Sequence, residues 1–460
     1  MPQSPQTASF LPRGDALPGG RVVRGGDLPE RWWELFRSRA LTSLVDEAIE
    51  NNPDLRAAEA AVRVAQANAL AQRGALFPAL GGNFGANRQL VPGSTLSSGA
   101  ASGDNLYSVH TAQLSVAFAP DIFGGTRRLV EAADAQVKFQ AFQREGIYLT
   151  LAANVALAAI QEASLREQLA VTNRMVTLQG QLFDILKRQS DAGQIGQNDV
   201  IAQETVTAQS RLLLAPLQRQ LEQQRNLLAV LTGRLPSDAP RETFQLTSFR
   251  LPRTVPLTLP ANLIRQRPDI RAAEAALEAS NAQIGAAIAN RLPAISLTAN
   301  AGSSATALSQ LFTPGTGFWF VGANVMQTVF DAGTLANRQV AAEETFAQSA
   351  QLYRKAVLVA FQNVADALRA LQSDARMVRD AANAERAASR GIDLVRRQVE
   401  SGQVSIGLLL ASQQAYLQTS LARVQAEAAQ LADMIALFQA LGGGWWNRPA
   451  VTDPAGNANL

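Results

Sequence analysis

The stretch NPDLRAAEAA at residues 52–61 returns as RPDIRAAEAA at residues 267–276, and this repetition decides the fold. The Pro-Ala pair at 78–79 returns at 293–294, at the same offset of 215 residues. Further along, AGQI at 192–195 returns as SGQV at 401–404, and Gly233 returns as Gly442, both at an offset of 209. Ordered matches at several separated points indicate a duplicated chain, so we expect two copies of one structural unit.

Each copy predicts a helix, two strands, a long helix, a turn and a second helix. The first helix opens at Pro53 or Pro268, where a missing N–H costs nothing. A Pro ends it, and the apolar period then changes from 3.6 to 2, which indicates a strand. In the second copy one side of this strand is apolar and the other polar, at Ile295, Leu297, Ala299 and Ala301 against Ser296, Thr298 and Asn300. We therefore expect β-hairpins at about 80–118 and 294–329.

Two long segments without Pro, 126–190 and 334–400, predict unusually long helices. At about 1.5 Å per residue each would span roughly 100 Å. A Gly turn and a second helix follow each of them, which gives helical hairpins over 126–232 and 334–441. Pro216 should kink the second helix of the first hairpin.

Composition excludes several kinds of site. The chain of 460 residues is 47% apolar and 17% charged with a net charge of +3, so it predicts a large core and gives little support for nucleic-acid binding. The absence of Cys excludes disulfides, thiolate metal sites and Cys nucleophiles, and the single His110 excludes sites that need two histidines. We therefore expect no enzyme, no catalytic residue, no cofactor and no bound metal.

No run of about 18 uncharged apolar residues predicts a membrane-spanning helix. The best candidate, residues 147–160, is shorter and contains Thr150 and Asn154. Transmembrane β-strands alternate and escape a hydropathy test. Two long helical hairpins leave apolar stripes exposed, and two short β-hairpins leave strand edges unpaired. We therefore expect several chains to assemble and to close a membrane barrel with an even number of strands. Four aromatics fit an interfacial girdle, although a soluble core would also use them: Tyr107, Phe318, Trp319 and Phe320.

Four motifs carry a resemblance that covers nearly the whole chain. They are WWELF at 32–36, the paired NPDLR and RPDIR segments, the turns DIFG at 121–124 and VFDAG at 329–333, and LGGGW at 441–445. The chain resembles the outer-membrane efflux proteins of the TolC/OprM type, nearest the NodT-like subgroup. The resemblance implies a mainly α fold with a membrane β-barrel, in which a homotrimer forms a 12-stranded outer-membrane barrel continuous with a 12-helix periplasmic α-barrel.

The resemblance also implies the domain organisation and the partners. The domains would be an N-terminal extension with an equatorial segment (1–51), repeat 1 (52–233), an equatorial linker (234–260), repeat 2 (261–442) and a tail (443–460). The protein would be the passive exit duct of a tripartite pump that exports drugs or other small molecules from a Gram-negative cell. Its partners would be a periplasmic adaptor, an inner-membrane pump driven by protons, and outer-membrane lipid.

The two Gly turns at the hairpin tips are the candidate adaptor contacts: Gly193, Gln194, Ile195 and Gly196, with Gly402, Gln403, Val404 and Ser405. The glycines could equally serve only as helix ends. The family often has Asp just beyond the second tip as a closing ring, but the matching positions here are Leu408 and Ala411. We expect a hydrophobic constriction instead, with Asp199 either near the pore or simply solvated at a helix start.

The N-terminal sequence does not itself support export, and two alternative functions stay open. Residues 1–26 contain neither the apolar segment of an export signal nor the lipid-bearing Cys that NodT-like members usually have, so localisation in the outer membrane rests on the resemblance. Within the same fold class, a conduit for type I protein secretion is the alternative function. A soluble periplasmic adaptor or coiled-coil scaffold is the alternative from a different class. The sequence does not name the exported compound.

Overall fold

The structure is a computed structural model that describes residues 21–90, 106–240, 242–252, 254–257 and 260–448. The chain forms two compact units. The first draws on residues 1–61, 141–272 and 353–460, and the second on 62–140 and 273–352. Each unit therefore takes residues from both sequence repeats. Three predicted segments lie outside the described residues. They are the first 20 residues of the N-terminal extension, the loop at 91–105 and the tail beyond 448.

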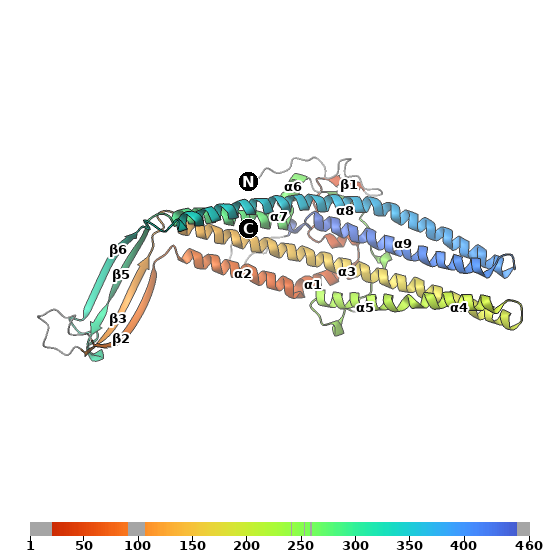
Figure 1. Ribbon diagram of the computed structural model, residues 1–460, viewed down its shortest axis with the longest axis horizontal. Helices are drawn as coiled ribbons and strands as arrows, with labels where there is room; N and C mark the ends of the chain where they lie inside the picture. Colours follow the sequence, from red (N-terminus) through yellow and green to blue (C-terminus); the bar gives the residue numbers. More distant parts are fainter. Residues whose placement is uncertain (1–20, 91–105, 241, 253, 258–259, 449–460) are drawn as a thin grey trace. The chain divides into compact units, whose positions relative to one another are not determined.

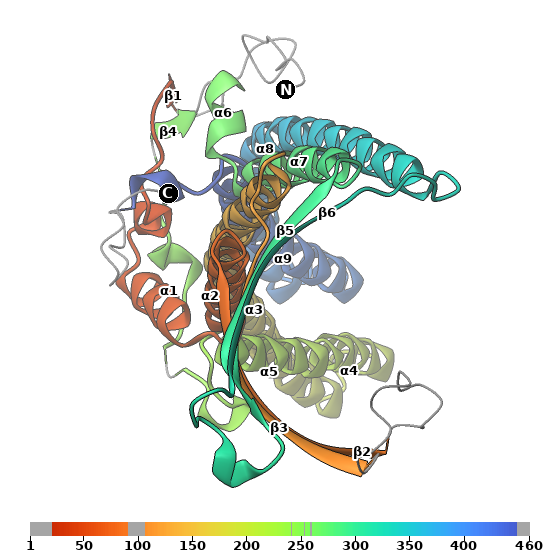
Figure 2. The same cartoon turned by 90° about the vertical axis from the view of Figure 1, so that its left-hand side faces the viewer.

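The second unit contains a four-stranded antiparallel sheet in the order β2-β3-β5-β6 (Figure 2). Its strands are β2 (Ala79–Leu90), β3 (Leu106–Phe118), β5 (Ala294–Ala305) and β6 (Gly317–Met326). The last strand ends three residues before the predicted limit of 329. The reason is that its partner strand begins at Ala294, directly after Pro293, which has no N–H with which to extend the ladder.

The helices that flank the strands have matching lengths in the two repeats. Helices α2 (Pro53–Gly74) and α7 (Pro268–Ala289) each have 22 residues. Helices α3 (Gly125–Asp191) and α8 (Thr334–Glu400) each have 67 residues, several times the ordinary helix length. One 18-residue window of α3 reaches a mean hydropathy of 1.2, but 67% of it is buried in the structure. A packed core helix accounts for that window, so it is weak evidence for a membrane span.

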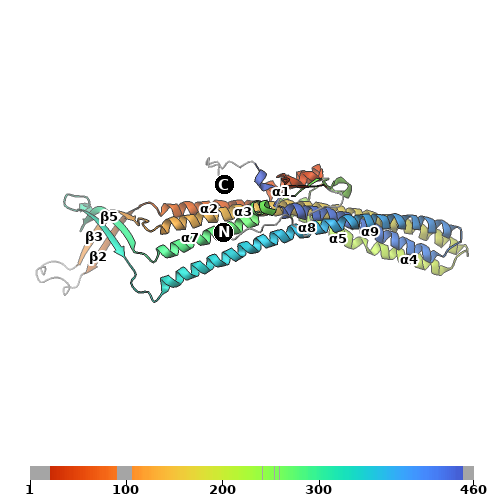
Figure 3. The same cartoon turned by 90° about the horizontal axis from the view of Figure 1, so that it is seen from above.

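In the first unit the chain turns back at the end of each long helix (Figures 1 and 3). Helices α4 (Gln197–Leu212) and α5 (Leu214–Leu231) follow α3, and α9 (Ile406–Ala440) follows α8. The interruption between α4 and α5 lies at Leu213, three residues before Pro216. Because Pro216 lacks an N–H and its ring crowds the carbonyl four residues earlier, the helix divides in two near the place where a kink was predicted.

The core of the first unit gathers aromatic side chains from the start and end of the chain. Trp32, Trp33 and Phe36 belong to a short 3-10 helix, η1 (Trp32–Phe36), and are fully buried. The Trp32 ring packs against Phe438 of α9, with 5.7 Å between ring centroids. The WWELF motif therefore packs against α9, and helix α1 (Arg39–Asn51) follows it.

The LGGGW motif closes the same core. Its three glycines, Gly442, Gly443 and Gly444, all have positive φ, and a Cβ on Gly443 would overlap the Leu149 side chain. This close approach explains why glycine occupies the turn. The next segment, η6 (Trp445–Asn447), is held by a hydrogen bond of 2.6 Å from Nε1 of Trp445 to the carbonyl of Gln266.

The remaining elements of the first unit are short. They are the parallel pair β1 (Arg21–Arg24) and β4 (Thr254–Leu257), the 3-10 turns η3 (Pro236–Asp238) and η4 (Leu246–Ser248), and helix α6 (Pro260–Gln266). A further 3-10 turn, η5 (Leu308–Gln310), lies between β5 and β6 in the second unit.

Candidate functional site

The two hairpin tips share one backbone geometry. Gly193 and Gly402 adopt left-handed conformations, with φ of 72° and 71°. The N–H of Gln194 donates to the carbonyl of Gln189 at 2.9 Å, and that of Gln403 donates to Gln398 at 2.8 Å. These six-to-one bonds are Schellman caps, which require glycine at the preceding position. The repeated glycine is thus explained by helix termination, and a contact with an adaptor stays a prediction.

The residues after the cap are also equivalent. Gly196 and Ser405 are extended N-caps of α4 and α9, with ψ of 150° and 153°. The tip glycines, the two Gln side chains and both N-caps are exposed, whereas Ile195 and Val404 are half-buried within the chain. The apolar tip residues are therefore partly covered already, and the surface that the tips present is mainly polar.

Asp199 and Leu408 occupy the same place in the two repeats. The N–H of Asp199 donates to Gly196 and that of Leu408 donates to Ser405, both at 3.1 Å. Asp199 is half-buried, while Leu408 is 47% exposed. Leu408 and the exposed Ala411 are three residues apart on α9 and share a face. Of the three predicted constriction residues, the structure therefore brings Leu408 and Ala411 together on α9. The third, Asp199, holds the position equivalent to Leu408 in the first repeat.

The strand register gives the sheet one apolar and one polar face. Residues paired across neighbouring strands share a face, so each row can be followed through the sheet. One face carries apolar side chains that are exposed: Leu80, Phe84, Leu114, Leu297, Trp319, Val321 and Val325. The other carries mostly polar side chains: Asn83, Asn87, Thr111, Gln113, Ser115, Ser296, Thr298, Asn300 and Asn324. An exposed apolar face of this size requires a covering layer.

The four predicted girdle aromatics divide between these faces. Trp319 pairs with Ala301 and lies on the apolar face, where it is 80% exposed. Phe318 and Phe320 pair with Gly302 and Asn300 and lie on the polar face. Tyr107 is also on the polar face, where Nε2 of Gln89 donates to its hydroxyl. Consecutive strand residues alternate, so one girdle cannot hold Phe318, Trp319 and Phe320 together. Trp319 is the one of the four that lies on the apolar face, and a girdle of these aromatics at a membrane interface stays a prediction.

The strand-to-helix turns are built on two aspartates. Asp121 accepts backbone hydrogen bonds from Thr126 and Arg127, both at 2.9 Å, at the start of α3. Asp331 accepts from Gly333 at 2.9 Å and Leu335 at 2.8 Å at the start of α8. Burial acts to raise the pKa of Asp121, but the N–H groups of Arg127 and Thr126 outweigh it and hold the pKa low. The N–H of Leu335 lowers the pKa of Asp331. Both motifs are therefore charged helix caps.

One acidic pair was missed by sequence reasoning. Asp374 on α8 is 6% exposed, and its Oδ2 atom has no hydrogen-bond partner in the structure. Burial, together with the neighbouring carboxyl of Asp433 on α9, raises the pKa of Asp374 to about 7. The two residues lie far apart in the sequence, so no local pattern could have found them.

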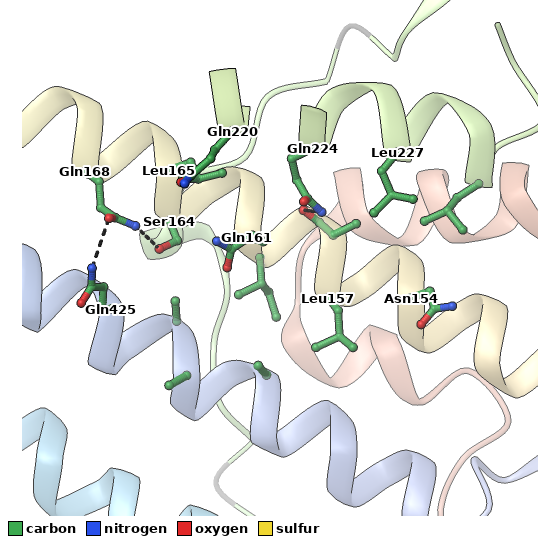
Figure 4. A pocket seen from close by; sticks show the side chains of 16 residues that line it. Asn154, Leu157, Gln161, Ser164, Leu165, Gln168, Gln220, Gln224, Leu227 and Gln425 are labelled. Atoms are coloured by element: carbon green, nitrogen blue, oxygen red, sulfur yellow. Dashed lines mark hydrogen bonds between the residues drawn. The ribbon is translucent and has the colours of Figure 1, made fainter. Parts of the chain in front are cut away.

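A groove lined by amide and apolar side chains was missed as well. It has a volume of about 690 Å³ and lies between α3, α5 and α9 (Figure 4). Five glutamines line it with Leu and Ala side chains: Gln161, Gln168, Gln220, Gln224 and Gln425. Nε2 of Gln168 donates to Ser164 at 3.0 Å, and Nε2 of Gln425 donates to Gln168 at 3.4 Å. No ionisable side chain lines the groove, so it offers hydrogen bonds to uncharged groups and no acid–base chemistry.

Metal chemistry finds no support in the described part of the chain. Among these residues, no group of three or more His, Asp and Glu side chains is arranged to hold a metal ion.

Comparison with known proteins identifies the family. The model of a family described as "Outer membrane efflux protein" matches residues 44–234 and 259–443, most of the chain. The chain belongs to the outer membrane efflux protein family. It is therefore an outer-membrane protein of a Gram-negative bacterium and a transport channel of efflux systems. The NodT-like subgroup stays a prediction.

Curated relatives of this efflux family align over most of their length. The pyoverdine export outer membrane protein OpmQ of Pseudomonas putida is 30% identical, over 90% of this chain and 88% of the relative. The toluene efflux pump outer membrane protein TtgC of Pseudomonas putida is 29% identical, over 97% of this chain and 92% of the relative.

Solved structures of channels share the fold. The outer-membrane channel OprN superposes with a TM-score of 0.88 at 24% identity, covering 96% of this chain and 98% of that one. The open state of the Neisseria gonorrhoeae MtrE outer membrane channel superposes with a TM-score of 0.82 at 27% identity, with the same coverage. These likenesses confirm the predicted fold of one chain of an outer-membrane channel, mainly α with a four-stranded sheet.

Proposed function

We propose that three copies of this chain assemble into the passive exit duct of a tripartite efflux pump. The two-faced sheet carries this proposal. Among the described residues no strand pairs with the outer edge of β2 or of β6, and one sheet face is apolar and exposed. A strand edge inside a bilayer must pair with another strand, because no water is present there to bind its backbone N–H and C=O groups. Pairing of β6 with β2 of the next copy removes both edges and turns the apolar face towards lipid.

The energy for export comes from partners. The relatives TtgC and SepC are named as outer membrane proteins of efflux pumps, which supports an adaptor and an inner-membrane pump as the remaining components. The tips present exposed polar side chains, which suits contact with a second protein. We propose that the tips contact the adaptor through Gln194 and Gln403, and that the pump is driven by protons.

The cargo class is small molecules. The relatives are named for pyoverdine, toluene and solvents, at nearly the same identity of 29–30%. These cargoes differ in size and polarity, although each relative is about equally similar to this chain. A passive duct lined by the mostly polar and uncharged face of the sheet fits this breadth. Substrate choice then belongs to the pump.

Complementation in a Gram-negative strain that lacks its own efflux duct tests the proposal. The full chain is expressed in the outer membrane with its cognate adaptor and pump, and growth is measured against dyes, solvents and antibiotics. We expect raised tolerance for several unrelated compounds. Failure to raise tolerance, with secretion of a protein substrate through an ATP-driven exporter instead, would establish the type I alternative. Recovery of the protein in the soluble fraction would support the scaffold.

The closing ring at the second tip is tested separately. We propose that Leu408 and Ala411, with Asp199 at the matching position of the other repeat, form the narrow end of the tunnel. Leu408→Asp introduces three carboxylates per trimer and should raise the cation conductance of the closed channel in planar bilayers. Gly391→Ala, at a position of α8 with no neighbour within 4 Å, is the control. An unchanged conductance in Leu408→Asp would remove Leu408 from the constriction.

A further inference from the structure

The connection between β5 and β6 is an unusual surface loop. Residues 306–316 contain no charged side chain, in a chain that is 17% charged. Two large apolar residues of this loop are exposed: Leu308 at 59% and Phe312 at 73%. Surface loops are ordinarily polar because water is their only neighbour. An uncharged loop with two exposed apolar side chains indicates a neighbour that is not water.

Phe312 has a strained backbone. Its φ of 72° lies in the left-handed region, which bulky residues rarely adopt. Strain of this kind persists only where the surrounding structure fixes it, and it concentrates at positions with a function. A loop selected only for chain reversal would have glycine here, as it does three residues later at Gly315, with φ of 94°.

Hydrogen bonds fix the strained residue to the sheet. The N–H of Phe312 donates to Oγ of Ser303 at 3.1 Å, and this Oγ also lies 2.6 Å from Oγ1 of Thr316. Ser303 is 4% exposed, so the loop covers it. The loop also bonds to itself, because Gln310 N–H donates to Ala307 and Thr313 N–H donates to Gln310. A loop with such internal bonding can leave bulk water at low cost.

The hydrogen bond between Phe312 and Ser303 places the loop on the apolar face. Ser303 follows Ala301 by two residues on β5, so both lie on the same face, about 7 Å apart along the strand. Ala301 pairs with Trp319, which is 80% exposed on that face. The loop therefore continues the apolar face beyond Trp319, towards the end of the sheet that is remote from the helix connections.

We propose that Phe312 and Leu308 insert into the interfacial region of the outer leaflet, as a lipid-contact element beside Trp319. The inference rests on the proposed function, since it needs the apolar face to be turned to lipid. The chemistry of the occupant is that of the boundary between lipid headgroups and acyl chains, where aromatic side chains are favoured. A neighbouring copy that covers the loop is the competing outcome of the test.

Single-cysteine labelling tests the proposal directly, because the chain has no Cys of its own. The full-length variants Phe312→Cys, Leu308→Cys, Trp319→Cys and Asn324→Cys are labelled with an environment-sensitive fluorophore and reconstituted into phosphatidylcholine vesicles. One set of vesicles carries lipid with a nitroxide near the ester end of its acyl chain. Iodide in the buffer reports exposure to water. Trp319→Cys is the lipid-facing control, and Asn324→Cys is the control on the polar face.

We expect the labels at 312, 308 and 319 to lose most of their emission with nitroxide lipid and little with iodide, and the label at 324 to behave in the opposite way. Quenching at 319 but not at 312 or 308 would overturn the lipid contact and leave the proposed function intact. Protection at 312 and 308 from both quenchers would identify a neighbouring copy as the occupant. Absence of lipid quenching at all sites, 319 included, would contradict the proposed function itself.

Discussion

Asn52 and Arg267 perform one task in the two repeats with different side chains. Nδ2 of Asn52 donates to the carbonyl of Leu231 at 3.0 Å, and Nη1 of Arg267 donates to the carbonyl of Ala440 at 2.8 Å. Leu231 and Ala440 are the last residues of α5 and α9, so each bond satisfies a carbonyl that a helix end leaves free. The polar residue before Pro53 and Pro268 therefore ties the start of each repeat to the end of its hairpin.

Truncation of either residue should destabilise the chain. Asn52 also caps α2, because its Oδ1 accepts from Asp54 and Leu55, and it is 4% exposed. Loss of the cap and of the bond to Leu231 in Asn52→Ala should cost about 1–3 kcal/mol. Arg267→Ala should cost at least as much, since a charged donor is removed from a helix end. The measurement is denaturant unfolding in detergent, with Arg379→Ala at an exposed position of α8 as control. Equal midpoints for all three variants would contradict the role.

Two Gly→Ala substitutions should have opposite effects. In Gly443→Ala the new methyl overlaps the Leu149 side chain, and φ of 69° is unfavourable for Ala. We expect loss of the fold or a cost of several kcal/mol, on the scale of about 1–3 kcal/mol for overpacking plus strain. Gly391→Ala lies inside α8 in open space and should stabilise by about 0.5–1 kcal/mol. Thermal unfolding of the two variants side by side checks the prediction. Tolerance of Gly443→Ala would show that the LGGGW turn is not close-packed.

The Asp374–Asp433 pair predicts a pH dependence of stability. The pKa of Asp374 is raised to about 7 in the folded chain, above the ordinary value of 3.8. The folded state therefore binds the proton more tightly than the unfolded state between these values. Stability should fall as pH rises from about 4 to 7, and the loss should be complete above that range.

Asp374→Asn removes the titrating group, so its unfolding midpoint should fall less with pH than that of the parent chain and should be higher at pH 8. Asp380→Asn, on the same helix, is the control that keeps the pair intact. Unfolding midpoints are measured across this pH range. If the midpoint changed with pH in the same way in Asp374→Asn and in the parent chain, the acidic pair would not be the source of the pH dependence.

The strain at Phe312 predicts an unusual response to glycine. Phe312→Gly relieves a positive φ and should leave stability in detergent unchanged or raised by up to about 1 kcal/mol. Phe320→Gly, on the extended backbone of β6, should instead lose about 0.5–1 kcal/mol. Unfolding midpoints of the two variants provide the comparison. A larger loss in Phe312→Gly than in Phe320→Gly would mean that the ring is packed within the chain rather than presented outward.

The sequence predicted what depends on local pattern. The alternation from Ile295 to Ala301 indicated the two faces of β5 before any partner strand was known, and Pro216 indicated a kink near Leu213. The duplicated motif also predicted matching helices, and α3 and α8 have equal lengths. In each case the signal lies within a few residues, where backbone sterics and side-chain alternation act directly.

What the sequence could not supply depends on register and on distant contacts. Phe318, Trp319 and Phe320 read as one aromatic cluster, but the pairing with Asn300 to Gly302 divides them between faces. The strand limit at Met326 was set by Pro293, which directly precedes the partner strand β5. Asp374 and Asp433 meet only because α8 and α9 pack together. Ser303 accepts a hydrogen bond from Phe312 only because the loop after β5 turns back over the strand. None of these relations leaves a pattern along the chain.

The proposed duct depends on the free edges of the sheet closing on other copies of the chain. Electron cryomicroscopy of the full chain, extracted from outer membranes in detergent, tests it most directly. We predict a hollow particle with three-fold symmetry, in which β6 of each copy pairs with β2 of the next to complete twelve strands. A single-copy particle with the edges of β2 and β6 unpaired, or a solid particle from the soluble fraction, would contradict the account.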